Sequence, residues 1–456
     1  MAYSPSVTAS ITQSTAAATT SNINNAIFVS KHAFYPERVK GYSSLAEVTA
    51  DGSVPTSSNL YKALQKAFSV TNPSVPIYTG RQLVDSINMT PIVKNSTTYS
   101  MVVQTLSGTT YSDVYTISIE SGVSATAEEI CEAIAVKATA VITGGEATVT
   151  DNIGTVDGTI TVSGAASQQL IVTKVVGFEQ EFISTENGTD CFAGVIAENN
   201  EDYYFMTTES RDETFVTEFA AAVDAEATPK LFLVSTDEVG SLTDGSTTDL
   251  LLKLKEAQFQ RTAGFYTQNS EVSFNELAAC VAAGGFQAGA VNWKFLQNTD
   301  TKALNGNGVA LLSGEMGELL DRNASWVSKE SGLTYLHGGK LANGNWIDQQ
   351  IIADWTKIEM EARIQTLLVN MNAAGTPITG TSTKLDLIKN RITSVLTDGV
   401  GYGLFSSYAS PTMPTTISFE DQAARILDNI TFTAYFAAKI NFVLIDGNLT
   451  YNEEVA

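Results

Sequence analysis

The chain has 456 residues, of which 43% are hydrophobic, and its 49 acidic and 26 basic residues give a formal net charge of −23. At about 150 residues per domain, this length predicts about three domains. The acidic balance argues against nucleic acid and against an anionic membrane surface as partners, because both are bound through a basic face. The same charge predicts solubility and long-range repulsion between unassembled copies.

The cysteines and the lack of long apolar runs further limit the classes of protein to which the chain can belong. Cys131, Cys191 and Cys280 lie far apart and in no spacing typical of a metal site. We therefore expect a reducing compartment and no disulfide framework. The first residues lack the basic and apolar regions of a signal peptide. No apolar run approaches the roughly 18 residues of a membrane span.

The first candidate element is a strand near the N-terminus. Residues 7–13 alternate in the period of a half-buried strand, which places Val7, Ala9, Ile11 and Gln13 on one face. A stretch rich in Ser, Thr, Ala and Asn follows, so residues 1–25 are interpreted as an arm. A frayed terminus is the ordinary explanation. A tethered strand would instead offer its N–H and C=O groups to another chain.

Residues 26–87 have the pattern of the opening of an α/β domain. Ala26–Ser30 is a short apolar run that predicts a buried strand, and a helix is expected from Leu60. Residues 76–80 predict the next strand. Strand, helix and strand in this order favour an α/β core.

Residues 88–177 have a different pattern and predict an inserted β-rich domain. Alternating runs begin at Tyr99, and further strands are expected at 146–150, 158–163 and 169–175. One helix is expected over Ala125–Ala140, with Glu128 and Glu129 in its first turn, where the helix dipole favours them.

The α/β pattern resumes in residues 178–330. Strands are expected at 203–206, 230–235 and 262–266, and each is followed by a helix, at 212–225, 249–258 and 274–283. Three successive βα units predict a doubly wound, mostly parallel sheet. The predicted fold class is therefore α/β, or α+β in a multidomain sense, with a mostly parallel core, an inserted β-rich domain and strand-forming arms.

Residues 331–456 predict a C-terminal domain of helices followed by strands. Helices are expected at 345–371 and 384–396, and strands at 430–437, 440–445 and 447–451, without an obvious partner. The end of the chain is interpreted as a second arm, whose candidate contact residues are Phe442, Leu444, Asp446, Leu449 and Tyr451. Two strand-like ends favour a self-assembling protein.

Motifs for chemistry are scarce. The two histidines, His32 and His337, accompany no Gly-x-Ser-x-Gly and no His-Glu-x-x-His motif. Gly306-Asn307-Gly308 lacks the third glycine of a dinucleotide loop and is interpreted as a turn. Acidic pairs are interpreted as solvated surface. We therefore expect no catalytic, cofactor-binding or metal-binding residues and no enzyme activity.

Three segments near the start resemble a known family. Residues 34–45 (FYPERVKGYSSL), 61–69 (YKALQKAFS) and 78–81 (YTGR) are similar to segments of contractile, myovirus-type bacteriophage tail sheath proteins. The inserted domain and the segment from Trp346 into the long helix are similar to that family as a general pattern. The motif-like identity is confined to the first 80 residues.

The resemblance implies a structural subunit that polymerises as stacked hexameric rings around a tail tube. Its arms would add strands to the sheets of neighbours, and the sheath would contract without nucleotide hydrolysis to drive the tube through the host envelope. The implied partners are other sheath subunits, the tail tube protein, the baseplate and the tail terminator or neck proteins, with no nucleic acid and no membrane bound by the subunit itself. The protein would be part of the virion and be assembled in the host cytoplasm.

Two expectations concern which parts of the subunit face the outside of the sheath and which face the tube. The inserted domain is expected on the outside of the sheath. The helix at 384–396 is expected to face the tube, with Lys384, Lys389 and Arg391 as candidate contacts.

Two alternatives stay open. The first is another self-assembling virion protein, or a surface-layer or adhesion protein. The second is an enzyme that uses the crevice at the carboxyl ends of its strands, for which His337 and Glu315 are the residues to test.

Overall fold

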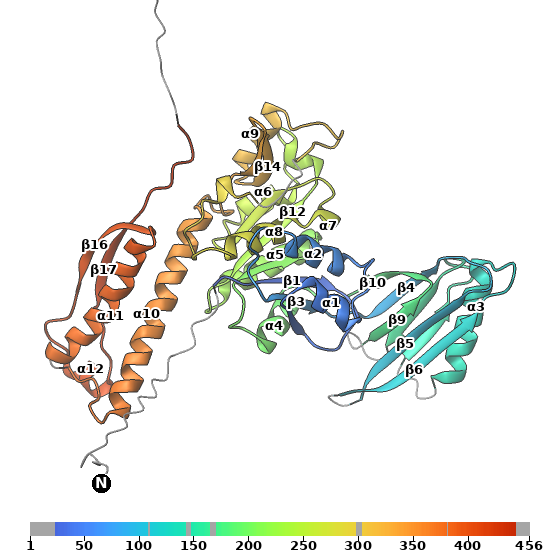
Figure 1. Cartoon of the computed structure of the whole chain (residues 1–456), viewed down its shortest axis with the longest axis horizontal. Coiled ribbons are helices and arrows are strands. Elements are labelled where there is room, and N and C mark those ends of the chain that lie inside the picture. Colours follow the sequence, from blue (N-terminus) through green and yellow to red (C-terminus); the bar gives the residue numbers. More distant parts are fainter. Residues whose placement is uncertain are drawn as a thin grey trace, which may run out of the picture. The chain divides into compact units, whose positions relative to one another are not determined.

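A computed structural model describes residues 23–107, 110–142, 147–164, 170–297, 303–380 and 382–443 (Figure 1). The described chain forms two compact units, a larger one within Ser21–Ile351 and a smaller one that begins at Ile352. None of the helices within these ranges combines the length and the apolar character that crossing a membrane requires.

The larger unit is built on an eight-stranded sheet with the order β15-β14-β13-β12-β11-β1-β3-β2. Its inner strands pair in parallel, whereas β2 and β15 at the two edges pair antiparallel. The inner strands β11, β12 and β13 are buried along their whole length and are mostly apolar, because both faces of the sheet are covered. The strands are β1 (Ala26–Lys31), β2 (Val39–Tyr42), β3 (Ile77–Gln82), β11 (Phe205–Thr208), β12 (Leu231–Thr236), β13 (Thr262–Tyr266), β14 (Ser325–Glu330) and β15 (Leu333–His337).

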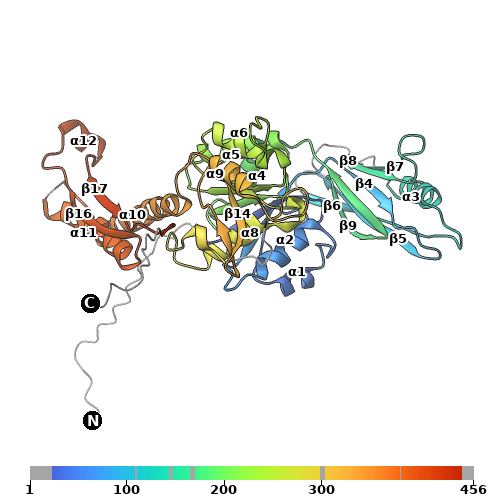
Figure 2. The same cartoon turned by 90° about the horizontal axis from the view of Figure 1, so that it is seen from above.

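Helices pack on both faces of this sheet (Figure 2). Phe192, Phe219 and Leu254 bring α4, α5 and α6 onto one face. On the other face lie α2 and α8, where the Phe274 ring meets Phe28 of β1 edge-on. The doubly wound α/β fold that the sequence predicts is thus confirmed. The helices are α1 (Leu45–Asp51), α2 (Asn59–Phe68), α4 (Gly188–Glu198), α5 (Glu213–Ala225), α6 (Leu250–Glu256), α7 (Ser270–Ser273), α8 (Asn275–Gly284) and α9 (Ser313–Asp321), with 3₁₀ turns at Val239–Leu242 and Trp293–Phe295.

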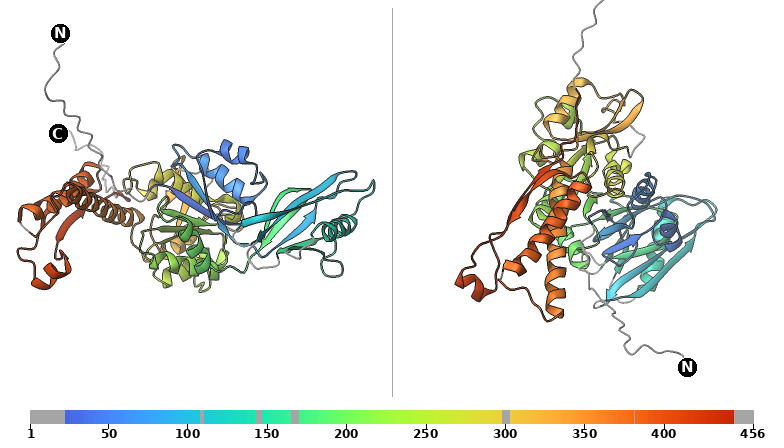
Figure 3. Two further views of the ribbon diagram at one scale, coloured as in Figure 1. Left: turned by 90° about the horizontal axis from the view of Figure 1, so that it is seen from below. Right: turned by 60° about the vertical axis from the view of Figure 1, so that its left-hand side comes forward.

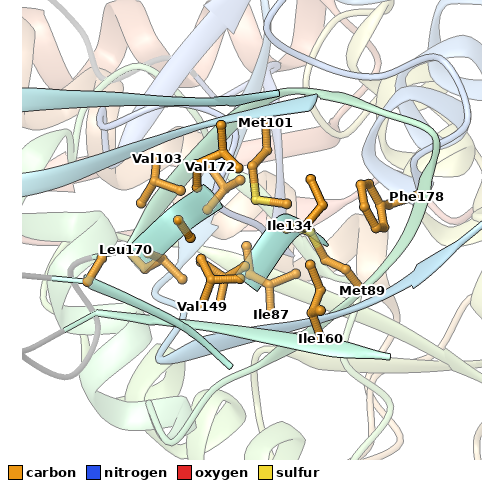
Figure 4. Packing of buried hydrophobic residues seen from close by; sticks show 14 of the residues in the cluster. Ile87, Met89, Met101, Val103, Ile134, Val149, Ile160, Leu170, Val172 and Phe178 are labelled. Carbon is orange, nitrogen blue, oxygen red and sulfur yellow. The ribbon is translucent and has the colours of Figure 1, made fainter. Parts of the chain in front are cut away.

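A β-rich module interrupts the chain between β3 and α4. Its strands form two antiparallel sheets, β10-β4-β8-β7 and β6-β5-β9. Side chains of both sheets and Ile134 of α3 share one hydrophobic core (Figure 4). The chain enters and leaves the module through paired neighbouring strands, β4 and β10. Its elements are β4 (Ser86–Pro91), β5 (Thr98–Ser107), β6 (Thr110–Glu120), α3 (Ala127–Val141), β7 (Ala147–Asp151), β8 (Ile160–Gly164), β9 (Ile171–Val176) and β10 (Phe178–Ile183).

The smaller unit consists of helices and one β-hairpin. The long helix α10 (Ile347–Ala373) begins in the larger unit and continues into the smaller one. It is followed by α11 (Ser382–Gly401), β16 (Phe405–Thr412), α12 (Phe419–Ala424) and β17 (Thr431–Phe436). Figure 3 shows from two sides that α10 and α11 (orange) lie side by side, with β16 and β17 (red) beside them.

Two predictions for the C-terminal end are wrong. The strand expected at 430–437 forms as β17, but it has a partner, β16. Residues 440–443 of the strand expected at 440–445 are not in a strand, and the rest of that segment, like the strand expected at 447–451, lies outside the described residues. An alternating sequence supplies only the side-chain pattern, whereas a strand also needs a neighbour for its hydrogen bonds.

Candidate assembly surface

The helices α10 and α11 form the support for the hairpin of the smaller unit. Apolar residues at helical spacing on α11, among them Ile388, Ile392 and Val395, are buried. Arg363 of α10 fixes the pair, because its guanidinium donates to Asp398 (2.6 Å) and to the Ser394 hydroxyl (2.9 Å) of α11. The hairpin therefore stands on a rigid base.

The hairpin approaches α11 closely at one point. A Cβ atom on Gly399 would lie 2.5 Å from the ring of Phe405, the first residue of β16. A glycine at this position is therefore required for the observed packing of the strand on the helix.

The hairpin has open edges. Strands β16 and β17 pair antiparallel, with register shifts between Phe405 and Ser407 and between Ala409 and Thr412. Within the described part of the chain they form a sheet of only these two strands. Each strand thus has one edge without a strand beside it. A two-stranded sheet is marginal alone and is stabilised by further strands.

An apolar groove lies between the hairpin and α10. Its volume is about 620 Å³. Its walls come from one face of α10 and from β17, where Phe432 and Phe436 are 43% and 44% exposed. The lining residues are Ala353, Thr356, Lys357, Met360, Glu361, Phe405, Phe432, Thr433, Ala434 and Phe436. A groove with an apolar floor beside an open strand edge has the features of a site for β-strand addition.

Large apolar side chains near the hairpin are exposed to solvent. Phe419 at the start of α12 is 90% exposed. Ile440, Phe442 and Val443, which follow β17, are exposed to a similar degree. Large exposed apolar side chains of this kind are typical of surfaces that bind other proteins.

The predicted contact residues fall mostly outside the described chain. The N-terminal set, Val7, Ala9, Ile11 and Gln13, lies there, and so do all C-terminal arm residues except Phe442, namely Leu444, Asp446, Leu449 and Tyr451. Phe442 is exposed and follows the last described strand.

The three candidate tube contacts lie on two sides of α11. Lys384 and Arg391 are seven residues apart and so share one side of the buried stripe, whereas Lys389 lies on the other side. The Lys384 ammonium donates to the carbonyl oxygen of Thr376 at 3.1 Å. The structure brings two of the three together and leaves the third apart.

The crevice of the enzyme alternative also exists. A cavity of about 690 Å³ lies at the carboxyl ends of β1, β3 and β11, next to β10. The Glu209 carboxylate lies in its wall and accepts hydrogen bonds from the Lys31 N–H (3.2 Å) and from the Asn59 amide (2.9 Å). The carboxylate therefore occupies the position at the start of α2 where a doubly wound enzyme would bind an anion.

The two residues to test for the enzyme alternative do not line this crevice. His337 stacks on Trp326 at 4.4 Å between ring centres, and burial lowers its pKa to about 4. Glu315 accepts hydrogen bonds from the Leu312 N–H (2.7 Å) and the Asn305 amide (3.1 Å) at the start of α9. Both residues have structural partners.

Comparisons place the fold among known structures. No protein-family model matches the sequence, and no curated protein matches it either. A chain in the cryo-EM structure of the anti-feeding prophage baseplate, 6-fold symmetrised, is similar in fold with a TM-score of 0.53 and 11% identity, over 98% of this chain and 100% of that one.

Two sheath tail proteins also resemble the chain. The protein from Listeria innocua has a TM-score of 0.49 and 10% identity over 93% of this chain and 97% of its own. The protein from Desulfitobacterium hafniense has a TM-score of 0.48 and 8% identity over 95% and 97%. At a TM-score above 0.5, the likeness to the baseplate chain shows a similar fold over the whole length of this chain.

Proposed function

We propose that the chain is a structural subunit of a contractile phage tail sheath. The observation that carries the proposal is the apolar groove beside the open edge of β17, in a chain whose fold is similar to a component of a 6-fold symmetrised baseplate. A strand edge that has no neighbouring strand among the described residues, together with exposed apolar side chains, favours pairing with another chain.

Strand addition by the arms would fill this site. The N-terminal strand of one subunit, with Val7, Ala9, Ile11 and Gln13, and the C-terminal arm of another, with Phe442, Leu444, Asp446, Leu449 and Tyr451, would extend the β16–β17 sheet of a third. A strand of about seven residues forms about three or four hydrogen bonds, each contributing roughly 1 kcal/mol net. A single added strand can dissociate again, whereas many added strands along a lattice together stabilise the assembly.

The assembled state follows from these links. Subunits would form stacked hexameric rings around a tail tube, bounded by the baseplate and by the neck or terminator proteins, within the virion. Contraction requires two packings of the same folded subunits, with the contracted one lower in free energy. No nucleotide hydrolysis enters this scheme, and the β-rich module would lie outside.

The tube contact is assigned to α11, with Lys384, Lys389 and Arg391 as candidates. Positive side chains on a subunit of net charge −23 would give the tube a local target that differs from the rest of the surface. Because Lys384 and Arg391 share one side of α11, charge reversal at this pair should impair assembly on the tube more than reversal at Lys389.

Electron microscopy of negatively stained protein tests the proposal. Full-length chain and a variant lacking residues 1–20 are compared over a range of concentrations, with and without tail tube. Hollow rods of uniform diameter that are lost on truncation are expected. Rods that need no tube and survive truncation would instead favour the other self-assembling class, a surface-layer or adhesion protein.

A further inference from the structure

Four Asn-Gly pairs occur in the chain, at residues 187–188, 305–306, 307–308 and 343–344. In such a pair the glycine nitrogen can attack the side-chain carbonyl carbon of the asparagine, because glycine has no side chain that hinders the approach. The attack closes a ring between neighbouring residues, so the two reacting groups are always within reach of each other. The rate then depends on what holds the asparagine side chain and the glycine N–H.

Two of the four pairs are held by the elements around them. Asn187 is the N-cap of α4, and its side chain accepts from a main-chain N–H of that helix at 2.8 Å. The Gly188 N–H donates to the Glu218 carboxylate at 3.0 Å. Asn343 is half-buried, and its side chain accepts from the Asn345 N–H at 3.0 Å. Both side chains would have to give up these hydrogen bonds before they could react.

The third pair begins with a residue that holds a turn together. Asn305 is 6% exposed, and its side-chain oxygen accepts from the N–H groups of Asn307 (3.0 Å) and Val309 (3.2 Å). Its side-chain nitrogen donates to the Glu315 carboxylate at 3.1 Å. Because both its oxygen and its nitrogen are hydrogen-bonded, Asn305 fixes the turn and is itself protected from reaction.

Asn307 differs from the other three asparagines. It lies in the stretch 306–310, in which every residue is exposed. Within the described ranges, its side chain makes no hydrogen bond. The Gly308 N–H donates to the carbonyl oxygen of Asn305 at 2.8 Å. An exposed turn opens locally at a small cost in free energy, and opening would free this N–H for reaction.

We propose that Asn307 is a site of spontaneous deamidation in the folded protein. The main-chain nitrogen of Gly308 loses its proton and attacks Cγ of Asn307, the Cγ–Nδ2 bond breaks, and ammonia leaves with that proton. Water then adds to either carbonyl of the cyclic imide and opens the ring. The product is aspartate or, where the main chain now runs through the side chain, isoaspartate. The net change exchanges one NH₂ group for one OH group, and no oxidant or cofactor is needed.

Either product would distinguish old subunits from new ones. Both products add a negative charge to the exposed turn, and isoaspartate also adds a methylene carbon to the main chain. The N–H of residue 307 would then no longer match the side-chain oxygen of Asn305. Copies of different age would therefore differ at one defined point of their surface.

Peptide mapping by mass spectrometry of the purified full-length chain tests the proposal. The chain is incubated at mildly alkaline pH, which favours the deprotonated nitrogen, once in buffer and once in urea. In the folded chain, we expect conversion at Asn307 to be several-fold faster than at Asn187, Asn305 and Asn343. The products should be two peptides of equal mass, one with aspartate and one with isoaspartate.

The unfolded chain is the control for local sequence. In urea the four pairs should convert at similar rates, because all of them consist of the same two residues and the fold no longer protects any of them. Absence of conversion at Asn307 in the folded chain, or faster conversion at one of the other three, would overturn the proposal. A preference for Asn307 that persists in urea would also count against it, because the fold would then not be its source.

Two variants test the role of the turn. Asn305→Ala removes the side chain that holds the turn, so conversion at Asn307 should become faster. Asn307→Gln keeps an exposed amide, but its longer side chain closes a ring less readily. The products at this position should therefore disappear while the circular dichroism spectrum is unchanged. An unchanged or lower rate at Asn307 in the Asn305→Ala variant would contradict the assigned role of the turn.

Discussion

At the residue scale, the family-like segment near the start proves to be structural. Arg38 of the motif at 34–45 is 11% exposed and donates to the nearly buried Glu186 at 2.5 and 3.2 Å. Glu186 also accepts from the Leu83 N–H at 2.7 Å. The ion pair therefore ties the motif to both chain segments that connect the core with the β-rich module.

Removal of one partner of this ion pair should destabilise the fold strongly. Arg38→Met leaves a buried carboxylate without its cation, and we expect a loss of about 3–5 kcal/mol in the free energy of unfolding. Denaturant unfolding of the larger unit measures it. Lys253→Met is the matched control, because its ion pair with Glu213 is 32% and 45% exposed and should contribute less than about 1 kcal/mol. Equal losses in the two variants would contradict this account.

The buried histidine should make stability depend on pH. His32 accepts a hydrogen bond from the Phe34 N–H, and burial, then Arg81 and Arg38, hold its pKa well below 6.5. The unfolded chain therefore binds the proton first, and the free energy of unfolding falls as the pH drops below about 6.5, by up to about 1.4 kcal/mol per pH unit. His337, with a pKa of about 4, contributes with the same sign.

Urea unfolding between about pH 6.5 and pH 5 measures the change in the free energy of unfolding per pH unit. Ordinary carboxyl groups titrate below this pH range. The variant His32→Asn keeps an acceptor for the Phe34 N–H but does not titrate. We expect a smaller slope in this variant. An unchanged slope in both His32→Asn and His337→Asn would exclude the histidines as its source.

At the element scale, the proposed assembly depends on the hairpin and its groove. Phe432 lines the groove, whereas Tyr435 lies on the same strand, is exposed and does not line it. The two residues therefore offer a comparison within one strand.

Phe432→Asp should block assembly without unfolding the subunit. A carboxylate on the groove floor would have to lose its water when a strand is added, which disfavours that step. We expect no rods by electron microscopy and an unchanged monomer melting curve. Tyr435→Asp should still assemble, and loss of rods in both variants would show that β17 as a whole, not the groove, is required.

Much of the core can be predicted from the sequence, whereas the groove cannot. Buried strands such as β12 and β13 are mostly apolar, and the helices α5 and α6 begin at the capping residues Asp212 and Asp249. Strand β16 is harder to detect because it contains Pro411 and is largely exposed.

The groove joins residues about 70 positions apart, which no local pattern reveals. The same holds for the hydrogen bonds that join Lys230 and Glu226 to Asn200, because they connect the segment before β12 with the segment before β11. Periodicity reports which face of an element is apolar, but not which element lies beside it.

At the scale of the whole molecule, charge should control the rate of assembly. Copies with a net charge of −23 repel each other over the Debye length, which falls from about 30 Å at 0.01 M salt to about 8 Å at 0.15 M. We therefore expect light scattering of the full-length chain to rise faster as salt is added at constant protein concentration. A slower rise would show that attraction between opposite charges drives assembly instead.

The pairing of β4 with β10 has a consequence for how such a chain can change. Because entry and exit lie side by side at the spacing of neighbouring strands, about 5 Å, the core meets the same two attachment points whatever is folded between them. This insertion site would therefore accept a different module without any change in the strand order of the parallel sheet. A foreign domain with adjacent termini, inserted between β4 and β10, would then be displayed once on each subunit of the proposed polymer.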